Sequence, residues 1–194
     1  KYLIEYTFDL LKKNNIKNKY VITDSDFIKK IANKYDINSD YIRPKNLSGS
    51  KIELLKNIIH FNKYIENKLI FKYYVILQPT SPLRSIKDLE NAINQFTNKN
   101  CESLYSISKS IEHPNETIYL KKNIIHNFLK KTKSLRQLYK KSYFINGAIY
   151  IFDKKLLLKN TIISKNKHGY SLMKKINSID IDDLEDLELV KNLI

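Results

Sequence analysis

Two carboxylates stand two positions apart near the end of the chain, Asp180 and Asp182 in the run Ile-Asp-Ile-Asp. If this run is a strand, both side chains project from the same face, because successive strand residues alternate. Two carboxylates at a strand end suit a hard cation such as Mg²⁺, which keeps several waters and bridges to phosphate groups. Acids are also common at helix starts, where they cap the helix and complement its dipole. The spacing alone favours this second interpretation.

A second group of polar side chains lies in residues 78–84, Gln-Pro-Thr-Ser-Pro-Leu-Arg. The segment follows a continuous apolar run that predicts a buried strand, and loops at the carboxyl ends of parallel strands are where α/β proteins bind ligands. Two prolines stiffen the loop, while an amide, two hydroxyls and a guanidinium offer contacts for a sugar or a phosphate. A plain strand-to-helix turn, in which Pro ends the strand and Ser caps the helix, explains the same residues equally well.

The positive charge of the chain is spread out rather than concentrated. The formal net charge is +15, but only three of the 35 basic residues are arginines, and the lysines lie along the whole chain beside many Asn and Ile residues. This pattern indicates a compositional bias rather than a basic stripe, so no nucleic-acid partner is expected. Arg offers a planar fork of donors that Lys cannot copy, which makes Arg84 and Arg136 candidates for anion binding. A surface ion pair is the ordinary alternative for each.

Cysteine use and hydropathy limit the class of protein. The single cysteine, Cys101, excludes an internal disulfide framework and favours a reducing cytoplasm. The longest apolar runs, such as residues 73–77, are far shorter than the roughly 20 residues that span a bilayer. We therefore expect a cytoplasmic protein with no membrane partner. The length and the 42% hydrophobic content predict one globular domain over residues 1–194.

Apolar periodicity divides the chain into alternating helices and strands. Helices are expected over residues 2–13, 25–35, 51–67, 85–98 and 183–193, and strands over residues 19–23, 72–78, 103–108, 117–120, 143–152 and 176–181. The alternation predicts a three-layer, Rossmann-like α/β fold with a mixed, mostly parallel sheet and some antiparallel pairing between residues 103 and 152. The chain opens on a helix, whereas in such folds a strand and a phosphate-holding loop usually come first.

These segments together resemble the acylneuraminate cytidylyltransferases, or CMP-sialic acid synthetases. Residues 78–84 look like the signature of that family, and other stretches match it in order and at fitting intervals. They are Thr23-Asp24-Ser25, Arg43-Pro44 with Leu47, His60, His113-Pro114, Arg136-Gln137, residues 146–150 and residues 179–182. The resemblance covers essentially the whole chain.

The resemblance implies a nucleotidyltransferase fold and a defined reaction. The anomeric hydroxyl of a nonulosonic acid attacks the α-phosphorus of CTP, pyrophosphate leaves, and Mg²⁺ or Mn²⁺ neutralises phosphate charge. The family's N-terminal strand and phosphate-binding loop would precede Lys1, which leaves open whether this chain is active alone. The alternatives are a cytidylyltransferase for another 2-keto sugar acid such as KDO, a non-catalytic remnant, and a basic nucleic-acid-binding protein.

The resemblance also implies the roles of single residues. The metal ligands are Asp180 and Asp182, and the catalytic residues are Asp182, Arg84 and Gln78. The substrate-binding residues are Gln78, Pro79, Thr80, Ser81, Arg84, Arg136, Gln137, Asn146 and Gly147. For Asn146-Gly147 the simple alternative is the turn of a type I′ hairpin, since the pair stands between two apolar runs.

Two further implications concern the partner chain and the substrate. The family is dimeric, and residues of about 112–143 are expected to reach over the partner. The resemblance does not decide whether Arg136 serves its own site or the partner's. Ile162 and Ile163 stand about where sialic-acid members carry aromatic residues, which favours a legionaminic- or pseudaminic-type acid as the substrate.

Overall fold

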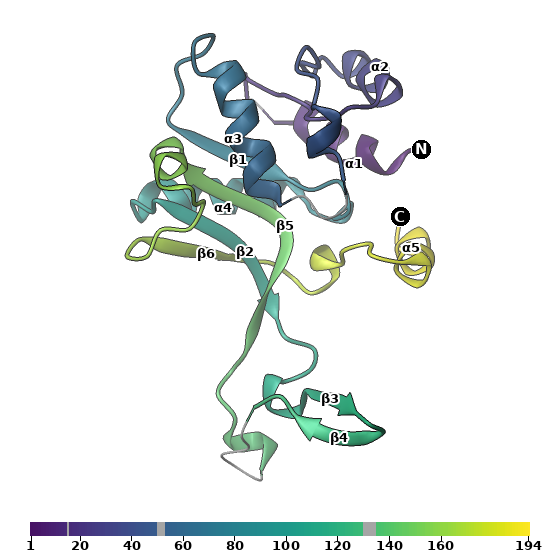
Figure 1. The fold of residues 1–194 in the computed structure, drawn as a ribbon. Coiled ribbons are helices and arrows are strands. Elements are labelled where there is room, and N and C mark those ends of the chain that lie inside the picture. Colours follow the sequence, from purple (N-terminus) through teal and green to yellow (C-terminus); the bar gives the residue numbers. More distant parts are fainter. Residues whose placement is uncertain (15, 50–52, 130–134) are drawn as a thin grey trace.

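The computed structural model of the protein describes residues 1–14, 16–49, 53–129 and 135–194. A four-stranded sheet forms the middle layer of the protein (Figure 1). Its strands, in spatial order, are β1 (Tyr73–Leu77), β5 (Tyr143–Asp153), β2 (Ser103–Lys109) and β6 (His168–Leu172). The β1–β5 and β2–β5 pairings are antiparallel, and the β2–β6 pairing is parallel. The sheet is therefore mixed, as expected, but its pairing is not mostly parallel. The reason is that β5 returns from an excursion that begins at the end of β2, and so enters the sheet against its neighbours.

The described helices are α1 (Leu3–Lys12), α2 (Asp26–Lys34), α3 (Leu54–Ile65), α4 (Ile86–Asn98) and α5 (Leu184–Lys191), with short 3₁₀ helices η1 (Lys45–Leu47), η2 (Pro114–Glu116), η3 (Arg136–Leu138), η4 (Lys154–Lys159) and η5 (Ile176–Ser178). Of these, α4 and α3 cover the two faces of the sheet. On one face α4 buries Leu89, Ala92 and Phe96 against β2 and β5. On the other face α3 packs against Tyr74 and Phe152. All five expected helices are present. Residues 51 and 52, where the third was expected to begin, lie outside the described residues.

Two of the strand predictions differ from the structure, and β6 was not predicted. Residues 19–23 form only isolated parallel bridges, Tyr20 with Asn38 and Thr23 with Ile42. Residues 176–181 form a 3₁₀ turn and then irregular chain. The strand that completes the sheet there is β6, whose sequence His-Gly-Tyr-Ser-Leu lacks the continuous apolar run of a buried strand.

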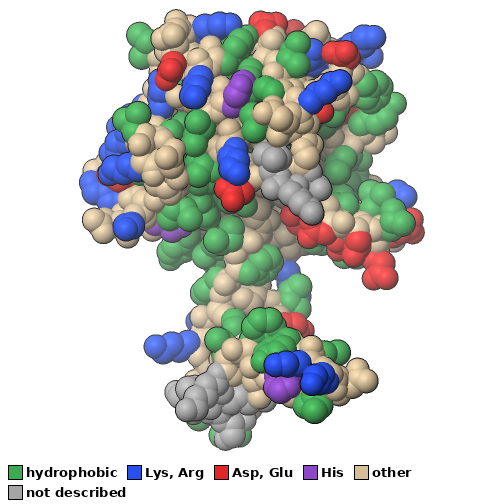
Figure 2. Space-filling model, viewed as in Figure 1, with side chains coloured by type: hydrophobic (Ala, Val, Ile, Leu, Met, Phe, Trp, Pro, Cys, Tyr) green, Lys and Arg blue, Asp and Glu red, His purple; other side chains and the backbone are tan. Residues whose placement is uncertain are grey.

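The excursion between β2 and β5 forms an arm that projects from the sheet (Figure 1). Its hairpin consists of β3 (Ile118–Lys121) and β4 (Ile124–Asn127). Apolar side chains on the arm are exposed, among them Leu120, Ile125 and Phe128, and Figure 2 shows hydrophobic side chains along it. This surface suits the expected contact with a second copy of the chain, which stays a prediction. Among the described residues, no helix is long and apolar enough to cross a membrane.

Candidate functional site

The loop after β1 is tied to the segment that precedes α5. Ser81 is fully buried, and its hydroxyl donates a hydrogen bond to Asp180 Oδ1 at 3.1 Å. The backbone N–H of Ile181 donates to the carbonyl oxygen of Thr80 at 2.9 Å. Two groups that lie about a hundred residues apart in the sequence, the polar loop and the paired carboxylates, are therefore side by side.

Gly147 lies next to the same carboxylate. It sits inside β5 rather than in a hairpin turn, at an irregularity where residues 146–149 of β5 face the single residue Ser106 of β2. Its φ of +74° is one that glycine adopts without strain. A Cβ atom here would lie 3.5 Å from Asp180 Oδ2 and 3.7 Å from the Tyr150 hydroxyl. The missing side chain thus leaves the backbone open beside Asp180. Bulges of this kind are frequent next to active sites.

Asn146 holds this irregular stretch in place. Its side-chain oxygen accepts hydrogen bonds from the Ser106 hydroxyl at 2.5 Å and from the Ala148 N–H at 3.2 Å. Its amide nitrogen donates to the Ser178 hydroxyl at 2.9 Å. The side chain is 3% exposed, and its amide is fully engaged with protein groups. The geometry therefore favours positioning of β5 over the substrate contact that the sequence predicts for this residue.

Arg84 is also engaged inside the protein. Its side chain is 4% exposed, and its guanidinium donates to Gln78 O at 3.2 Å, Ala148 O at 2.6 Å and Thr7 Oγ1 at 2.9 Å. Burial lowers the pKa of Arg84 to about 10, although the negative charges of Asp88 and Asp180 act in the opposite direction. The group therefore joins the loop after β1 to β5 and α1, instead of facing an open surface.

The carboxylates near α5 have two different roles: one caps the helix, and another is available for the candidate site. Asp183 caps α5, because its side chain accepts a hydrogen bond from the Asp186 N–H at 2.9 Å. Asp182 is exposed, and its backbone N–H donates to Asp186 Oδ2 at 3.1 Å. Within the described residues its own carboxylate has no hydrogen bond or ion pair. The segment is not a strand, so the argument that Asp180 and Asp182 share a strand face is wrong. Figure 2 shows acidic side chains gathered near α5.

The carboxylates of Asp180 and Asp182 are suitable Mg²⁺ ligands, but they are too few to enclose the ion. Asp180 keeps acceptor capacity beside Gly147, and Asp182 is uncommitted; both supply the oxygen ligands that Mg²⁺ takes. The described residues contain no group of three or more His, Cys, Asp or Glu side chains that could hold a metal. A closed protein cage for a metal is therefore not formed in this part of the chain. The donors suit an ion that is completed by water and by substrate phosphates.

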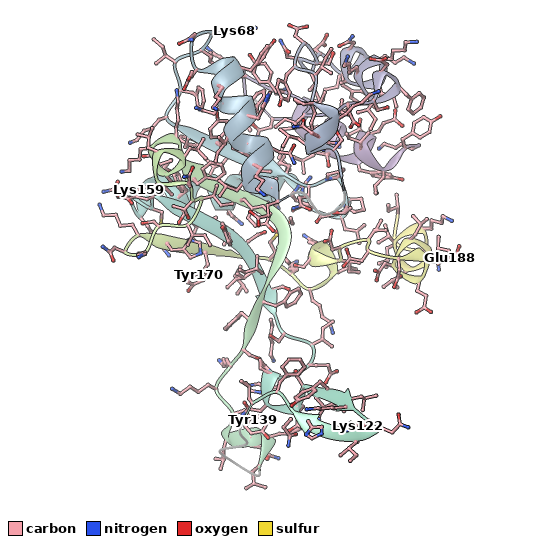
Figure 3. All side chains as sticks on the ribbon, in the orientation of Figure 1. Lys68, Lys122, Tyr139, Lys159, Tyr170 and Glu188 are labelled. Carbon is pink, nitrogen blue, oxygen red and sulfur yellow. The ribbon has the colours of Figure 1, made fainter. Side chains whose placement is uncertain are left out.

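The remaining predicted residues fall into two places. Gln78 is half-buried, Pro79 is exposed, and both line a cavity beside β1. Arg136 and Gln137 lie in η3 of the arm (Figure 3 labels the nearby Tyr139), away from the sheet and exposed. Arg136 Nη2 lies 3.8 Å from Glu116 Oε2. The structure does not bring the arm pair to the Asp180 site within one chain.

Tyr150 belongs near this site, although the sequence analysis gave it no role. Its side chain is half-buried, and its pKa is raised by burial and by the charge of Asp180. Tyr105 meets the Tyr150 ring edge-on at 4.8 Å between centroids. The only signal available in the sequence was its place at the end of the motif 146–150.

The chain matches known proteins in sequence and in fold. The Cytidylyltransferase family model matches residues 1–193. The chain is 27% identical over 201 residues to post-translational flagellin modification protein B of Campylobacter coli, covering 99% of this chain and 83% of that protein. It is 28% identical over 198 residues to the pseudaminic acid cytidylyltransferase of Campylobacter jejuni, covering 98% and 84%. A solved CMP:2-keto-3-deoxy-manno-octonic acid synthetase complexed with CTP has the same fold, with a TM-score of 0.67 at 10% identity, covering 98% of this chain and 86% of that one.

Proposed function

Since this chain belongs to the cytidylyltransferase family, we propose that it transfers CMP from CTP to the anomeric hydroxyl of a nonulosonic acid. The hydroxyl oxygen forms a bond to the α-phosphorus, the bond from that phosphorus to the bridging α–β oxygen breaks, and pyrophosphate leaves. The hydroxyl proton passes to solvent. Bound Mg²⁺ would neutralise the charge on the phosphate oxygens during this transfer.

The observation that carries the proposal is the position of Asp180. Its carboxylate lies between the Ser81 hydroxyl and the open backbone at Gly147, at the end of β1. One oxygen is oriented by Ser81, and the other faces the space that a Cβ at Gly147 would take. Asp180 and the uncommitted Asp182 are the residues that would hold the cation. Gly147 would let a substrate approach the backbone closely.

Arg84 supports this arrangement from beneath. Its three hydrogen bonds connect the carbonyl groups of Gln78 and Ala148 with Thr7 on α1. Those carbonyls adjoin Pro79 and Gly147, which line the predicted substrate site. We assign Arg84 a positioning role, because its donors point into the protein. Its positive charge also lies close enough to favour anionic substrates over neutral ones.

A nonulosonic acid of the pseudaminic or legionaminic type is the preferred substrate. The match to the Campylobacter jejuni pseudaminic acid cytidylyltransferase extends over nearly all of this chain. The structure gives no support to the expectation for Ile162 and Ile163, because Ile162 packs against the apolar cluster at α3 and the adjoining Ser164 N–H donates to Ser103 at the start of β2, at the end of the sheet away from Gly147. The arm, with its exposed apolar side chains, would bind a second copy of the chain. Arg136 and Gln137 would then act across that interface.

The test measures pyrophosphate release by the protein as its gene encodes it. CTP, Mg²⁺ and a panel of nonulosonic acids are supplied, with KDO as the competing sugar acid. We expect release with CTP and one nonulosonic acid, and little release with ATP, GTP or UTP. Release with KDO alone would contradict the proposed substrate class. If a folded protein releases no pyrophosphate with any acid of the panel, the proposed activity is contradicted.

A further inference from the structure

The segment between η5 and α5 carries both candidate metal ligands, yet it has no regular structure of its own. Residues 179–182 lie in neither a helix nor a strand. The backbone ladder of a helix or a strand therefore does not set the direction of the Asp180 and Asp182 carboxylates. A functional group on irregular chain keeps its place only if neighbouring side chains hold that chain by packing and hydrogen bonds.

A buried carboxylate on α4, that of Asp88, reaches this segment. Asp88 is 8% exposed, and its Oδ2 atom accepts three hydrogen bonds. Two come from Ser85, from its N–H at 2.9 Å and from its hydroxyl at 2.6 Å. The third comes from Asn177 Nδ2 of η5 at 2.7 Å. The capping box of α4 needs only the contacts between Ser85 and Asp88, so the bond from Asn177 serves something other than the start of the helix.

Asn177 thereby connects two parts of the chain that meet at the candidate site. Ser85 directly follows the polar loop 78–84, and Asn177 stands three residues before Asp180. An amide that donates to a carboxylate forms a charge-assisted hydrogen bond, which is stronger than a bond between two neutral groups. This bond therefore ties η5, and with it the start of the segment 179–182, to the amino end of α4.

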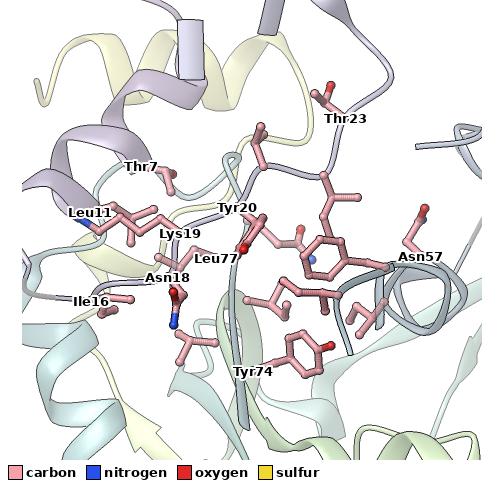
Figure 4. Close-up of a pocket in the computed structure, with 18 of the residues that line it drawn as sticks. Thr7, Leu11, Ile16, Asn18, Lys19, Tyr20, Thr23, Asn57, Tyr74 and Leu77 are labelled. Atoms are coloured by element: carbon pink, nitrogen blue, oxygen red, sulfur yellow. The ribbon is translucent and has the colours of Figure 1, made fainter. Parts of the chain in front are cut away.

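The loop before α4 is anchored on its other side as well. The Arg84 guanidinium donates to Thr7 Oγ1 of α1 at 2.9 Å. Figure 4 shows Thr7 on α1 and Leu77 at the end of β1, both at the cavity beside β1. The amino end of α4 is thus fixed to the core, whereas residues 179–182 lack regular structure. Of the two parts that the Asn177 bond joins, the irregular segment is the one that the bond orders.

Ser178 holds η5 from a second direction. Its side chain is 4% exposed, and its hydroxyl accepts a hydrogen bond from Asn146 Nδ2 at 2.9 Å. That bond joins η5 to the irregular stretch of β5. Because Asn177 is held by α4 and Ser178 by β5, the chain enters Asp180 from a defined position.

We propose that Asn177 is a positioning residue, which acts through Asp88 to keep the carboxylates of Asp180 and Asp182 available to one cation. Asn177 itself would touch neither the substrate nor the metal. The catalytic consequence rests on the proposed function, whereas the ordering of residues 179–182 does not. Side chains that orient metal ligands in this way typically change metal affinity or activity 10–100-fold when they are replaced.

Backbone hydrogen exchange measures the ordering without substrate or metal. The probe is the N–H of Ile181, which donates to Thr80 O at 2.9 Å. Asn177→Ala should speed its exchange at least about tenfold, because the loss of a bond to a charged acceptor shifts a local opening equilibrium by that factor. The N–H of Ile151, in the middle of β5 between β1 and β2, should keep its rate. Unchanged exchange at Ile181, or an equal rise at both amides, would overturn the proposal.

Asn177→Asp distinguishes a hydrogen-bond donor from a side chain that only fills space. Aspartate has nearly the shape of asparagine, but it places a second carboxylate against Asp88 Oδ2. We therefore expect the aspartate variant to speed Ile181 exchange more than the alanine variant does, and the opposite order would refute the donor role. Asn38→Ala is the matched control, because Asn38 Nδ2 also donates to an aspartate Oδ2, that of Asp40 at 3.1 Å. It should leave Ile181 exchange unchanged.

The catalytic consequence is measured as the Mg²⁺ dependence of pyrophosphate release by the protein as its gene encodes it. Asn177→Ala should raise the Mg²⁺ concentration for half-maximal release about tenfold, and saturating Mg²⁺ should restore most of the rate. An unchanged half-saturating concentration would contradict the positioning of the cation ligands. If the parent protein releases no pyrophosphate, the proposed function fails, while the exchange rates still decide whether Asn177 orders the segment.

Discussion

Replacing Arg84 with lysine separates the two roles available to this residue. The guanidinium donates to acceptors on three elements, at 2.6–3.2 Å, and is 4% exposed. A lysine ammonium is a point charge on a single stem and cannot serve all three. If two bonds to a charged donor are lost at about 1.5 kcal/mol each, the free energy of unfolding falls by about 3 kcal/mol. For a chain of this size that corresponds to a melting temperature lower by about 6–12 °C.

The assay is thermal or urea unfolding of the parent, Arg84→Lys and Arg136→Lys. Arg136 is the matched control, because its side chain is 73% exposed and its ion pair with Glu116 is long at 3.8 Å. Its replacement should change the free energy of unfolding by less than about 0.5 kcal/mol. A substrate-binding Arg84 would give the reverse pattern, with unchanged unfolding and reduced turnover. Equal melting temperatures for the parent and Arg84→Lys would refute the positioning role.

Three further outcomes are expected. Asp182→Asn should reduce CMP transfer at least about 100-fold with the fold intact. Asp183→Asn makes the same charge change at a residue that caps α5, and it should keep most of the activity because Asn also caps helices well. Equal losses of activity in steady-state assays would contradict the metal role of Asp182. Gly147→Ala should cost about 1–2 kcal/mol in urea unfolding, because its φ of +74° is unfavourable for alanine; a neutral result would mean that the backbone there relaxes freely. Burial lowers the pKa of His168, so the unfolded chain binds the proton more readily than the folded one. The free energy of unfolding should therefore fall as the pH drops below about 6.5. NMR titration of this ring should give a pKa below that value, and His168→Gln should reduce the loss of stability at low pH.

The helices were predictable because their signals are local. The capping box of Ser85 and Asp88 marks the start of α4, and both of its bonds are present. Ser25 likewise caps α2 by accepting from the Ile28 N–H. These features depend only on residues within a few positions of each other, so a single sequence contains them.

The strands at the far side of the sheet were not predictable in this way. Residues 176–181 have strand-like composition, yet β6 takes the place beside β2. Strand preference reflects packing against neighbours more than the backbone itself, so a local pattern cannot decide between two candidates. The antiparallel pairing of β2 with β5 was predicted, but the antiparallel pairing of β1 with β5 was not, because the place of β5 between β1 and β2 follows from the arm.

The candidate site was predictable in its residue types but not in its contacts. The resemblance placed Asp180 and the loop 78–84 in one site, and the Ser81–Asp180 bond joins them. Nothing in the spacing shows that Arg84 and Asn146 direct their polar atoms inward. Side-chain direction depends on partners such as Thr7 and Ser106, which lie far away in the sequence. The sequence identifies the polar residues of the site, but only the structure shows which of them face the site and which bind other parts of the protein.

The irregular stretch of β5 also divides the long ladder between β2 and β5 into two independent registers. On the sheet side Tyr105 faces Tyr150, and on the arm side Ile107 faces Ile145. Because a one-residue slip reverses every side chain of a strand, a change in the arm's length would normally invert the core. Here the irregular residues 146–149 separate the register of the arm from that of the sheet. The register of the arm is therefore not bound to the register of residues 149–153, whose side chains build the core.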